Sequence, residues 1–403
     1  MNKVEKYIAE RWDLCIRECR EDKGTLIGLP FPYTVPAVGH FDEMYYWDTY
    51  FTNKGLEIAG RYEQVKNNRD NMLYLVRRYG FMPNGNRTYY LGKSQPPFLS
   101  LMVSDVYSHY RDRKWLKEAY ETLKTEYDFW MKKRCSDLGL NYYDSQVWIS
   151  APADVIKEYT ERGGYVPEGK EADIARHFAA TCESGWDISP RWGNEAYNYA
   201  SVNLNSLLYL FEYNMSYFAG ELENGETERW QKKAVSRKEK MLKYMDDGSG
   251  ILLDYNFVTD SLSDIFSAAS IYPLFVRMAD KKHAEALVKK LCLLETDYGI
   301  LTCAKNHSGG NYQWDYPNGW ACLQYIAMVG LDHYGYQKEA KRIAEKFVNL
   351  VDRVYEETGN IWEKYNVVDG NICVTNEYDM PAMMGWTAGV YLSAGKYIEE
   401  TIL

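Results

Sequence analysis

The amino-acid sequence predicts an all-α fold in which six helical hairpins close into a ring, an (α/α)6 toroid. Three observations support this prediction: the helical segments come in pairs, helices that are apolar on nearly every side alternate with amphipathic ones, and long loops rich in aromatic residues and glycine separate the pairs. This alternation indicates an inner ring of helices surrounded by an outer ring. An open solenoid of helical pairs would follow the same packing rules and is the alternative.

The expected elements follow one another along a single catalytic domain of residues 1–403. Residues 1–19 have apolar positions at helical spacing, and residues 382–397 are their expected partner, so the two ends of the chain would complete the ring. The five pairs predicted between them are 45–60 with 62–79, 98–110 with 114–134, 197–218 with 226–245, 262–279 with 282–294, and 320–334 with 337–355. The expected loops are 22–44, 80–97, 136–195, 247–261, 295–319 and 357–381, with short strand hairpins near 141–150 and 251–256.

The bulk composition excludes several classes of function. With 47 basic and 57 acidic residues the net charge is −10, which argues against nucleic acid and anionic membranes as partners. The first 20 residues are charged throughout and contain no apolar run, so we expect neither a secretory signal nor a transmembrane span, and a cytoplasmic location. The eight cysteines are scattered and are expected to be reduced thiols. Because the six histidines are also dispersed, no metal and no cofactor are expected.

One short stretch stands out, residues 183–192, with the sequence Glu-Ser-Gly-Trp-Asp-Ile-Ser-Pro-Arg-Trp. It places the carboxyl group of Asp187 directly beside the indole of Trp186. A carboxyl group held against an apolar ring resists ionisation, which is how proteins make a proton donor that works near neutral pH. The alternative is structural, because Asp187 or Ser189 would also suit an N-cap for a helix that resumes after Gly193.

The loops between the helical pairs combine flat aromatic rings with carboxylates and amides. These combinations occur at residues 40–50, 83–87, 92–98, 313–320, 361–366 and 376–378. The chain as a whole contains 37 tyrosines and 12 tryptophans. Rings that are half apolar suit the C–H faces of a sugar, and carboxylates and amides suit its hydroxyl groups. The predicted partner is therefore a small neutral sugar.

The same loops contain longer motifs that resemble the trehalase family of glycoside hydrolases, whose members are (α/α)6 toroids. The matching motifs are Phe41, Glu43, Tyr45 and Trp47-Asp48-x-Tyr50; Pro83-Asn84-Gly85-Asn86-Arg87-x-Tyr89-Tyr90; Ser94-Gln95-Pro96-Pro97-Phe98; Glu183-Ser184-Gly185-Trp186-Asp187; Gln313-Trp314-Asp315-x-Pro317-Asn318-Gly319-Trp320; and Glu363-Lys364-Tyr365. They extend from about residue 28 to residue 392 and so cover nearly the whole chain.

The resemblance implies an inverting α-glycosidase that hydrolyses α,α-trehalose or a close α-glucoside. Asp187 would be the general acid and Glu363 the general base, with the carboxyl groups roughly 6.5–9.5 Å apart so that a water fits between them. An ion pair between Glu363 and the adjacent Lys364 is the structural alternative, although neighbouring residues seldom face each other. By the same resemblance, the residues that line the sugar subsites would be Phe41, Trp47, Asp48, Asn84, Gln95, Gly185 and Glu377, with Trp314 stacked beneath a ring.

Three positions depart from the family pattern. The chain has His40 and Lys93 where the family has arginines, and Asp154 ends a Pro-Ala-Asp segment where the family has Arg-Pro-Glu. Lysine and histidine do not reproduce the planar, bidentate hydrogen bonds of arginine, so a different leaving group is an alternative. An α-glucosyl or α-mannosyl compatible solute of the sugar–glycerate type would use His40 and Lys93 to bind a carboxylate. The second alternative is a helical scaffold that binds sugar without turnover.

Overall fold

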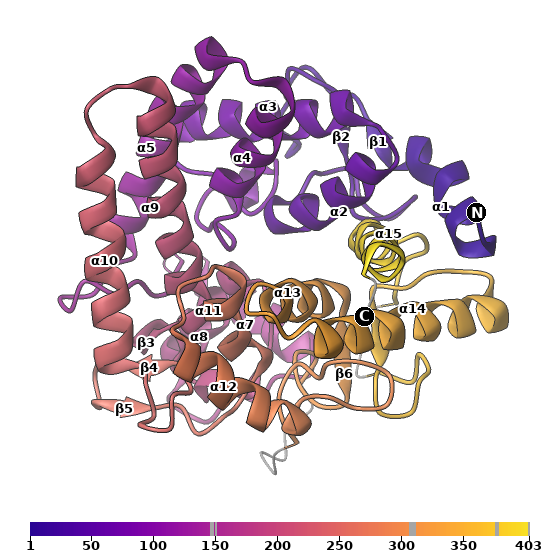
Figure 1. Cartoon of the computed structure of the whole chain (residues 1–403). Helices are drawn as coiled ribbons and strands as arrows, with labels where there is room; N and C mark the ends of the chain where they lie inside the picture. Colours follow the sequence, from indigo (N-terminus) through magenta and orange to yellow (C-terminus); the bar gives the residue numbers. More distant parts are fainter. Residues whose placement is uncertain (146–148, 150, 306–311, 375–378, 402–403) are drawn as a thin grey trace.

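The computed structural model shows the predicted (α/α)6 toroid (Figure 1). It describes residues 1–145, 149, 151–305, 312–374 and 379–401. The inner ring consists of α2 (Tyr46–Ile58), α4 (Leu99–Tyr110), α9 (Val202–Leu222), α11 (Tyr272–Phe275), α13 (Ala321–Asp332) and α15 (Gly385–Glu400). The outer ring consists of α1 (Lys3–Arg11), α3 (Tyr62–Tyr79), α5 (Arg113–Lys133), α10 (Thr227–Tyr244), α12 (Lys281–Lys290) and α14 (Gln337–Thr358).

Burial separates the two rings as the sequence predicts. Helix α13 is buried on most sides, whereas α14 buries a single stripe of apolar residues at helical spacing. Contacts run around the inner ring from α2 through α15, α13, α11 and α9 to α4. The ion pair between Lys54 of α2 and Asp105 of α4 completes the circle. The open solenoid is therefore excluded.

The two ends of the chain meet beside α15, which lies between α2 and α14 in Figure 1. Asn2 donates a hydrogen bond to the hydroxyl group of Tyr391 on α15 (2.7 Å), which links the two ends of the chain, while the main helix partners of α15 are α2, α14 and α13. The closest packing, however, is between α15 and α2. A Cβ atom on Gly55 would lie 2.6 Å from the Cα atom of Gly389, so glycine at these two positions allows the helix backbones to touch.

The predicted helix over residues 262–279 is wrong. Ser261–Leu262 forms strand β5, residues 268–271 form a 3₁₀ turn, and the α-helix α11 covers only Tyr272–Phe275. Pro273 explains the late start, because its ring excludes an α-helical turn before it. Arg277 adopts a left-handed conformation (φ 57°), which ends the helix.

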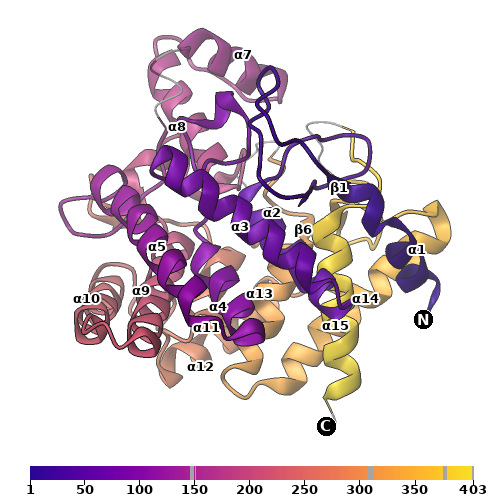
Figure 2. The ribbon, with the colours of Figure 1, turned by 90° about the horizontal axis from the view of Figure 1, so that it is seen from above.

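The described residues of the predicted loop over 136–195 include the helices α7 (Pro152–Glu161) and α8 (Glu171–Ser184). They pack against each other through a small apolar cluster separate from the main core, formed by Val155, Tyr159, Ile174, Ala175, Phe178, Cys182 and Ile188. Figure 2 shows the pair at one edge of the toroid, with α7 outermost. The signal for α8 is present in the sequence, since Ile174, Phe178 and Cys182 are four residues apart.

The strands are short, as predicted, but most of them do not form the hairpins predicted near residues 141–150 and 251–256. β3 (Tyr199–Ala200), β4 (Tyr255–Asn256) and β5 form one small antiparallel sheet, and β1 (Ile16–Arg17) pairs with β2 (Tyr33–Thr34). The strand pair that matters for the site is β6 (Asn318–Trp320) with β7 (Lys364–Asn366). It joins two loops that the sequence analysis treated separately.

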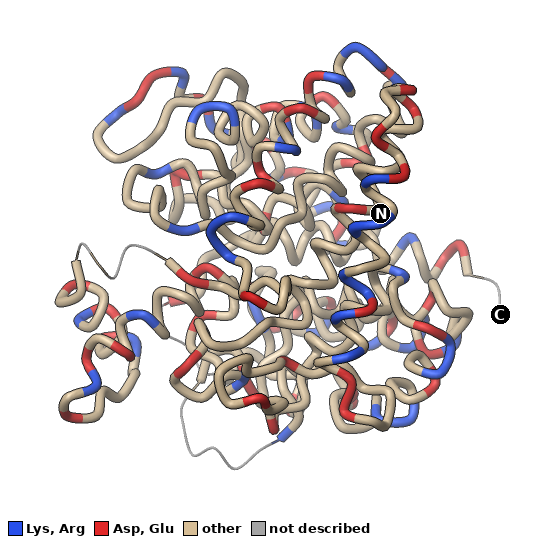
Figure 3. The backbone as a smooth tube through the Cα atoms, turned by 90° about the vertical axis from the view of Figure 1, so that its left-hand side faces the viewer, with Lys and Arg blue, Asp and Glu red and all other residues tan. Residues whose placement is uncertain are grey.

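Basic and acidic residues alternate over the helices that face the viewer in Figure 3. This mixture agrees with the moderate net charge of −10. Within the described residues, the structure has no helix with the length and apolar character needed to cross a membrane.

The close packing of α2 and α15 yields a stability test. We predict that Gly389→Ala lowers the free energy of unfolding by about 1–3 kcal/mol, because the new methyl group would collide with the backbone of α2 at Phe51. Gly395→Ala on the same helix is the control, since a Cβ atom there meets no neighbour within 4 Å. Thermal denaturation should show a lower midpoint only for Gly389→Ala, and equal shifts for the two variants would contradict the packing described.

Candidate active site

A cavity of about 740 Å³ lies at the N-terminal end of α2, where the long loops converge. The predicted site residues that line it are His40, Phe41, Trp47, Asp48, Asn84, Lys93, Gln95, Gly185, Asp187, Trp314 and Glu363. They come from segments up to about 320 residues apart in the sequence, yet they surround one space. The geometry thus brings together both candidate catalytic carboxylates and the candidate sugar-binding residues.

Asp187 enters the cavity from the turn that follows α8. Gly185 ends the helix in a left-handed conformation (φ 72°). A Cβ atom on Gly185 would lie 2.8 Å from the indole of Trp47, so only glycine fits both the turn and the contact. The following Trp186 is fully buried, and its ring stacks on Trp314 with centroids 5.2 Å apart.

The carboxyl group of Asp187 faces a cation. Nη2 of Arg162 donates a hydrogen bond to Oδ2 of Asp187 (2.9 Å), and both side chains are only partly exposed. Trp186, the expected apolar neighbour, instead has its ring against Trp314 and the guanidinium of Arg191, which lies 4.2 Å from the ring centroid. The environment of Asp187 is therefore more polar than the sequence suggests.

Glu363 lies immediately before β7, and its side chain lines the cavity. The pairing of Trp320 with Lys364 fixes this position, and Nε1 of Trp386 donates a hydrogen bond to the backbone oxygen of Glu363 (3.0 Å). The ion pair between Glu363 and the adjacent Lys364, which was the structural alternative for Glu363, is present. Nζ of the fully buried Lys364 lies 2.9 Å from Oε2 of Glu363 and 2.9 Å from Oε1 of Gln313.

Tryptophan rings form the floor of the cavity. Trp314 stacks on Trp320 with centroids 3.8 Å apart and an interplanar angle of 4°, and Trp386 meets both rings edge-on. The ring centroid of Trp47 lies 5.6 Å from that of Trp314. Because Trp320 already covers one face of Trp314, any stacking of a sugar on Trp314 must use the rest of the ring.

Asp48 is a third carboxyl group on the cavity wall. It lies in the first turn of α2, deep in the protein, with part of its surface open to the cavity. Burial is the main cause that raises the pKa of Asp48 to about 7, and the nearby carboxylates of Glu363 and Asp187 contribute to this rise. Around neutral pH, Asp48 is thus a mixture of protonated and ionised forms.

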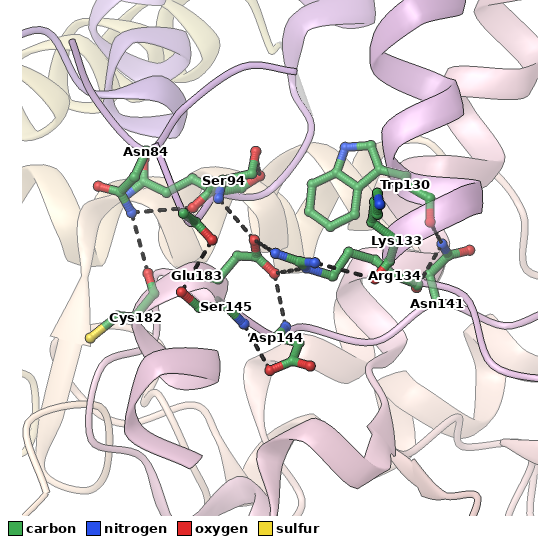
Figure 4. Close-up of polar contacts among 12 residues, drawn as sticks. Asn84, Ser94, Trp130, Lys133, Arg134, Asn141, Asp144, Ser145, Cys182 and Glu183 are labelled. Carbon is green, nitrogen blue, oxygen red and sulfur yellow. Dashed lines mark hydrogen bonds and ion pairs between the residues drawn. The ribbon is translucent and has the colours of Figure 1, made fainter. Parts of the chain in front are cut away.

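The fully buried Glu183 ties the loop at Ser94, the segment at Asp144 and the end of α5 at Arg134 to α8 (Figure 4). Its carboxylate accepts hydrogen bonds from the backbone N–H groups of Ser94 and Asp144 (2.8 Å each) and from the guanidinium of Arg134 (2.7 and 3.0 Å). We call these four residues the Glu183 network. It fixes Ser94, and with it the neighbouring cavity residues Lys93 and Gln95, relative to the end of α8.

Two amides complete the polar wall. Oε1 of Gln95 accepts a hydrogen bond from the backbone N–H of Trp47 (3.2 Å) and so satisfies the N-terminus of α2. Nδ2 of Asn84 donates to the backbone oxygens of Ser94 and Cys182 (3.3 Å each). These bonds fix the orientation of both amides before any ligand arrives.

Of the predicted site residues that the structure describes, Asp154 is not brought together with the others. Asp154 is exposed in the first turn of α7 and is not among the cavity residues, and Glu377 lies outside the described residues. The sequence analysis missed the contribution of α7, which lines the cavity with Glu158, Glu161 and the following Arg162. The four-residue spacing of Val155 and Tyr159 indicated a helix there, with these charged residues on its other faces. The cavity residues Tyr45, Tyr89, Tyr90, Gln313 and Trp320 lay in the quoted motifs, and Trp386 in the predicted last helix, but they were not named as site residues.

Within the described part of the chain, no group of three or more histidine, cysteine, aspartate or glutamate side chains is arranged to hold a metal ion. The groups that line the cavity include carboxylates, cations, amides and aromatic rings.

A helical toroid with two carboxylates in one aromatic cavity has the groups that a glycoside hydrolase needs, and comparison with known proteins shows the family. The family model named Trehalase matches residues 1–398, so the chain belongs to the trehalase family. Its structure is similar to neutral trehalase Nth1 from Saccharomyces cerevisiae, with a TM-score of 0.79 and 28% identity over 98% of this chain and 80% of that one.

Two more distant structures share the fold. One is an uncharacterized conserved protein from Thermus thermophilus, with a TM-score of 0.69 and 16% identity over 97% of this chain and 99% of that one. The other is the GH63 mannosylglycerate hydrolase from the same organism in complex with glucose, with a TM-score of 0.65 and 15% identity over 89% and 95% of the two chains. The chain is thus a glycoside hydrolase of the trehalase family with a sugar substrate.

The raised pKa of Asp48 predicts how stability depends on pH. Between pH 3.8 and about 7 the folded protein keeps a proton on Asp48 that the unfolded chain has lost, so this group makes the folded state less stable as pH rises through that range. We predict that Asp48→Asn removes this penalty and raises the free energy of unfolding relative to wild type by about 1–3 kcal/mol at pH 7.5, after allowance for water in the cavity. Denaturant unfolding at pH 4.5 should show little difference, and a constant difference at both pH values would contradict the assignment.

Proposed function

We propose that the protein is an inverting α-glycosidase that hydrolyses α,α-trehalose or a closely similar α-glucoside. The observation that supports this most strongly is that Asp187 and Glu363, presented by unrelated turns of the chain, line one cavity together with aromatic rings and fixed amides. A pair of carboxyl groups on either side of a sugar is what glycoside hydrolysis by acid–base catalysis requires. Residues 1–403 would form a single catalytic domain, which agrees with a family match over residues 1–398.

The cations beside the two carboxylates support an assignment of their roles. Lys364 is fully buried and sits against Oε2 of Glu363, so this partner is a fixed part of the interior. A permanent ammonium neighbour suits a general base, which must enter each turnover as a carboxylate. Glu363 would therefore be the group that takes a proton from the attacking water.

Asp187 would then act as the general acid. A proton moves from the Asp187 carboxyl group to the glycosidic oxygen as the bond between that oxygen and the anomeric carbon breaks. Water attacks the anomeric carbon from the opposite face and gives its proton to Glu363. Each turnover leaves Asp187 ionised and Glu363 protonated, and exchange with solvent restores both groups.

The polar groups at the cavity favour a small, hydroxyl-rich substrate. The oriented amides of Asn84 and Gln95 suit the hydroxyl groups of a sugar, and the tryptophan rings suit its C–H faces. Similarity to neutral trehalase at 28% identity supports trehalose in particular. A second candidate is a sugar–glycerate compatible solute, because Lys93 and His40 line the cavity and offer hydrogen-bond donors for a carboxylate. A GH63 mannosylglycerate hydrolase with bound D-glycerate shares the fold.

We expect the purified protein to release glucose from α,α-trehalose. Asp187→Asn and Glu363→Gln should each lower kcat by about 100- to 10,000-fold, since each removes one proton-transfer group. Asp154→Asn is the control, because this carboxyl group is exposed and lies outside the cavity, and it should keep wild-type activity.

A panel of α-glycosides, followed by the release of monosaccharide, separates the two substrates. Turnover of a sugar–glycerate without turnover of trehalose would favour the second candidate. Full activity in Asp187→Asn or Glu363→Gln would contradict the proposed mechanism for any substrate.

A further inference from the structure

Arg162, the residue that follows α7, contacts the candidate general acid Asp187 but takes no part in the proton transfers described above. Its Nη2 holds Oδ2 of Asp187 (2.9 Å), its Nη1 lies 3.3 Å from Oε1 of Glu158, and its guanidinium lies 5.2 Å from the ring of Phe178. Its side chain is 16% exposed and lines the cavity. Arg162 is therefore at once a partner of the candidate acid and a part of the cavity wall.

The two catalytic carboxylates differ in how their cations are held. Lys364 belongs to β7, is fully buried and lies over the ring of Trp320 (4.9 Å) in the main core. Arg162 instead follows a helix whose apolar contacts with α8 form a separate small cluster. The cation at Glu363 is thus enclosed, whereas the one at Asp187 is within reach of a ligand.

Stereochemistry limits what Asp187 can do while this bond persists. A guanidinium group has five N–H donors and no acceptor, so the oxygen that it holds cannot also carry a proton directed at Arg162. A carboxyl group that is to donate a proton to the glycosidic oxygen must therefore use its other oxygen or be released from Arg162. The same five donors suit the neighbouring hydroxyl groups of a sugar.

The position of Arg162 indicates which sugar it would meet. In an inverting site the base and its water lie on one face of the scissile bond, and the acid lies on the side of the leaving group. A residue that touches the acid and comes from the outermost helix pair (Figure 2) lies on that same side. Its N–H groups therefore face the leaving group rather than the sugar that is attacked.

We propose that Arg162 is a positioning and specificity residue whose hydrogen bond passes from Asp187 to the leaving group when substrate binds. This proposal rests on the function proposed above. In the structure Arg162 holds Oδ2 of Asp187. A leaving group with hydroxyl groups takes over these N–H donors, and Asp187, now released, takes up a proton from solvent and delivers it to the glycosidic oxygen. The site thereby selects a hydroxyl-rich leaving group.

The test compares two substrates that share the glucosyl group and differ in the leaving group. α,α-Trehalose offers hydroxyl groups and needs a proton, whereas the fluoride of α-D-glucosyl fluoride offers none and leaves as an ion without general-acid help. For Arg162→Gln we expect kcat/KM for trehalose to fall about 10- to 100-fold, as expected for loss of a charged hydrogen bond. The value for glucosyl fluoride should stay close to that of the wild type. Arg162→Lys, which keeps the charge and loses the planar fork, should lie between the two with trehalose.

Arg176→Gln is the matched control. Arg176 belongs to α8, forms an ion pair with Asp144 (2.8 Å) and is not among the cavity residues. It should leave the ratio of the two kcat/KM values unchanged.

Other outcomes overturn the proposal in distinguishable ways. Equal losses on both substrates in Arg162→Gln, together with a lower thermal midpoint, would mean that Arg162 only supports the structure. Wild-type trehalose activity in Arg162→Gln would refute the proposal and leave the proposed function intact. A wild-type protein that hydrolyses neither substrate would overturn the proposed function and this proposal with it.

Discussion

The buried carboxylate of Glu183 is the constraint on which the geometry of the site depends. One side chain, with no exposure to solvent, joins the loop at Ser94, the end of α5 at Arg134, the segment at Asp144 and its own helix α8. A buried carboxylate is stable only when its oxygens are fully hydrogen-bonded and its charge is paired. Loss of any one partner would therefore be costly, so the segments that border the cavity are held in a fixed relation.

The two candidate catalytic carboxylates differ in how firmly they are built into the structure. Trp320, Lys364 and the strand pair of β6 and β7 build Glu363 into the core, whereas Asp187 comes from a turn that meets the separate α7–α8 unit through Arg162. A base that must be ionised when substrate arrives and an acid that must then be protonated make opposite demands on their surroundings. The cation beside Glu363 is buried, whereas the cation beside Asp187 lines the cavity, so the surroundings of the two carboxylates differ accordingly.

The sequence predicted the toroid because helix burial follows from local periodicity, and α13 and α14 show the contrast as expected. It failed over residues 262–279, where only Tyr272–Phe275 is α-helical and the helix starts late at Pro273. It also failed for the strand pair of Trp320 with Lys364, which joins distant loops. The cavity residues were largely predicted because motif residues must converge on one ligand. Arg162 was missed, because its role depends on the placement of α7 and not on any pattern around it.

The stereochemistry of the first turnover tests the central claim most directly. Proton NMR can follow the anomers of glucose released from α,α-trehalose before they interconvert. If Asp187 and Glu363 act as acid and base on opposite sides of the bond, the attacked glucose appears as the β-anomer and the leaving glucose as the α-anomer, in equal amounts. Release of the α-anomer alone would show retention and would contradict this account of the site.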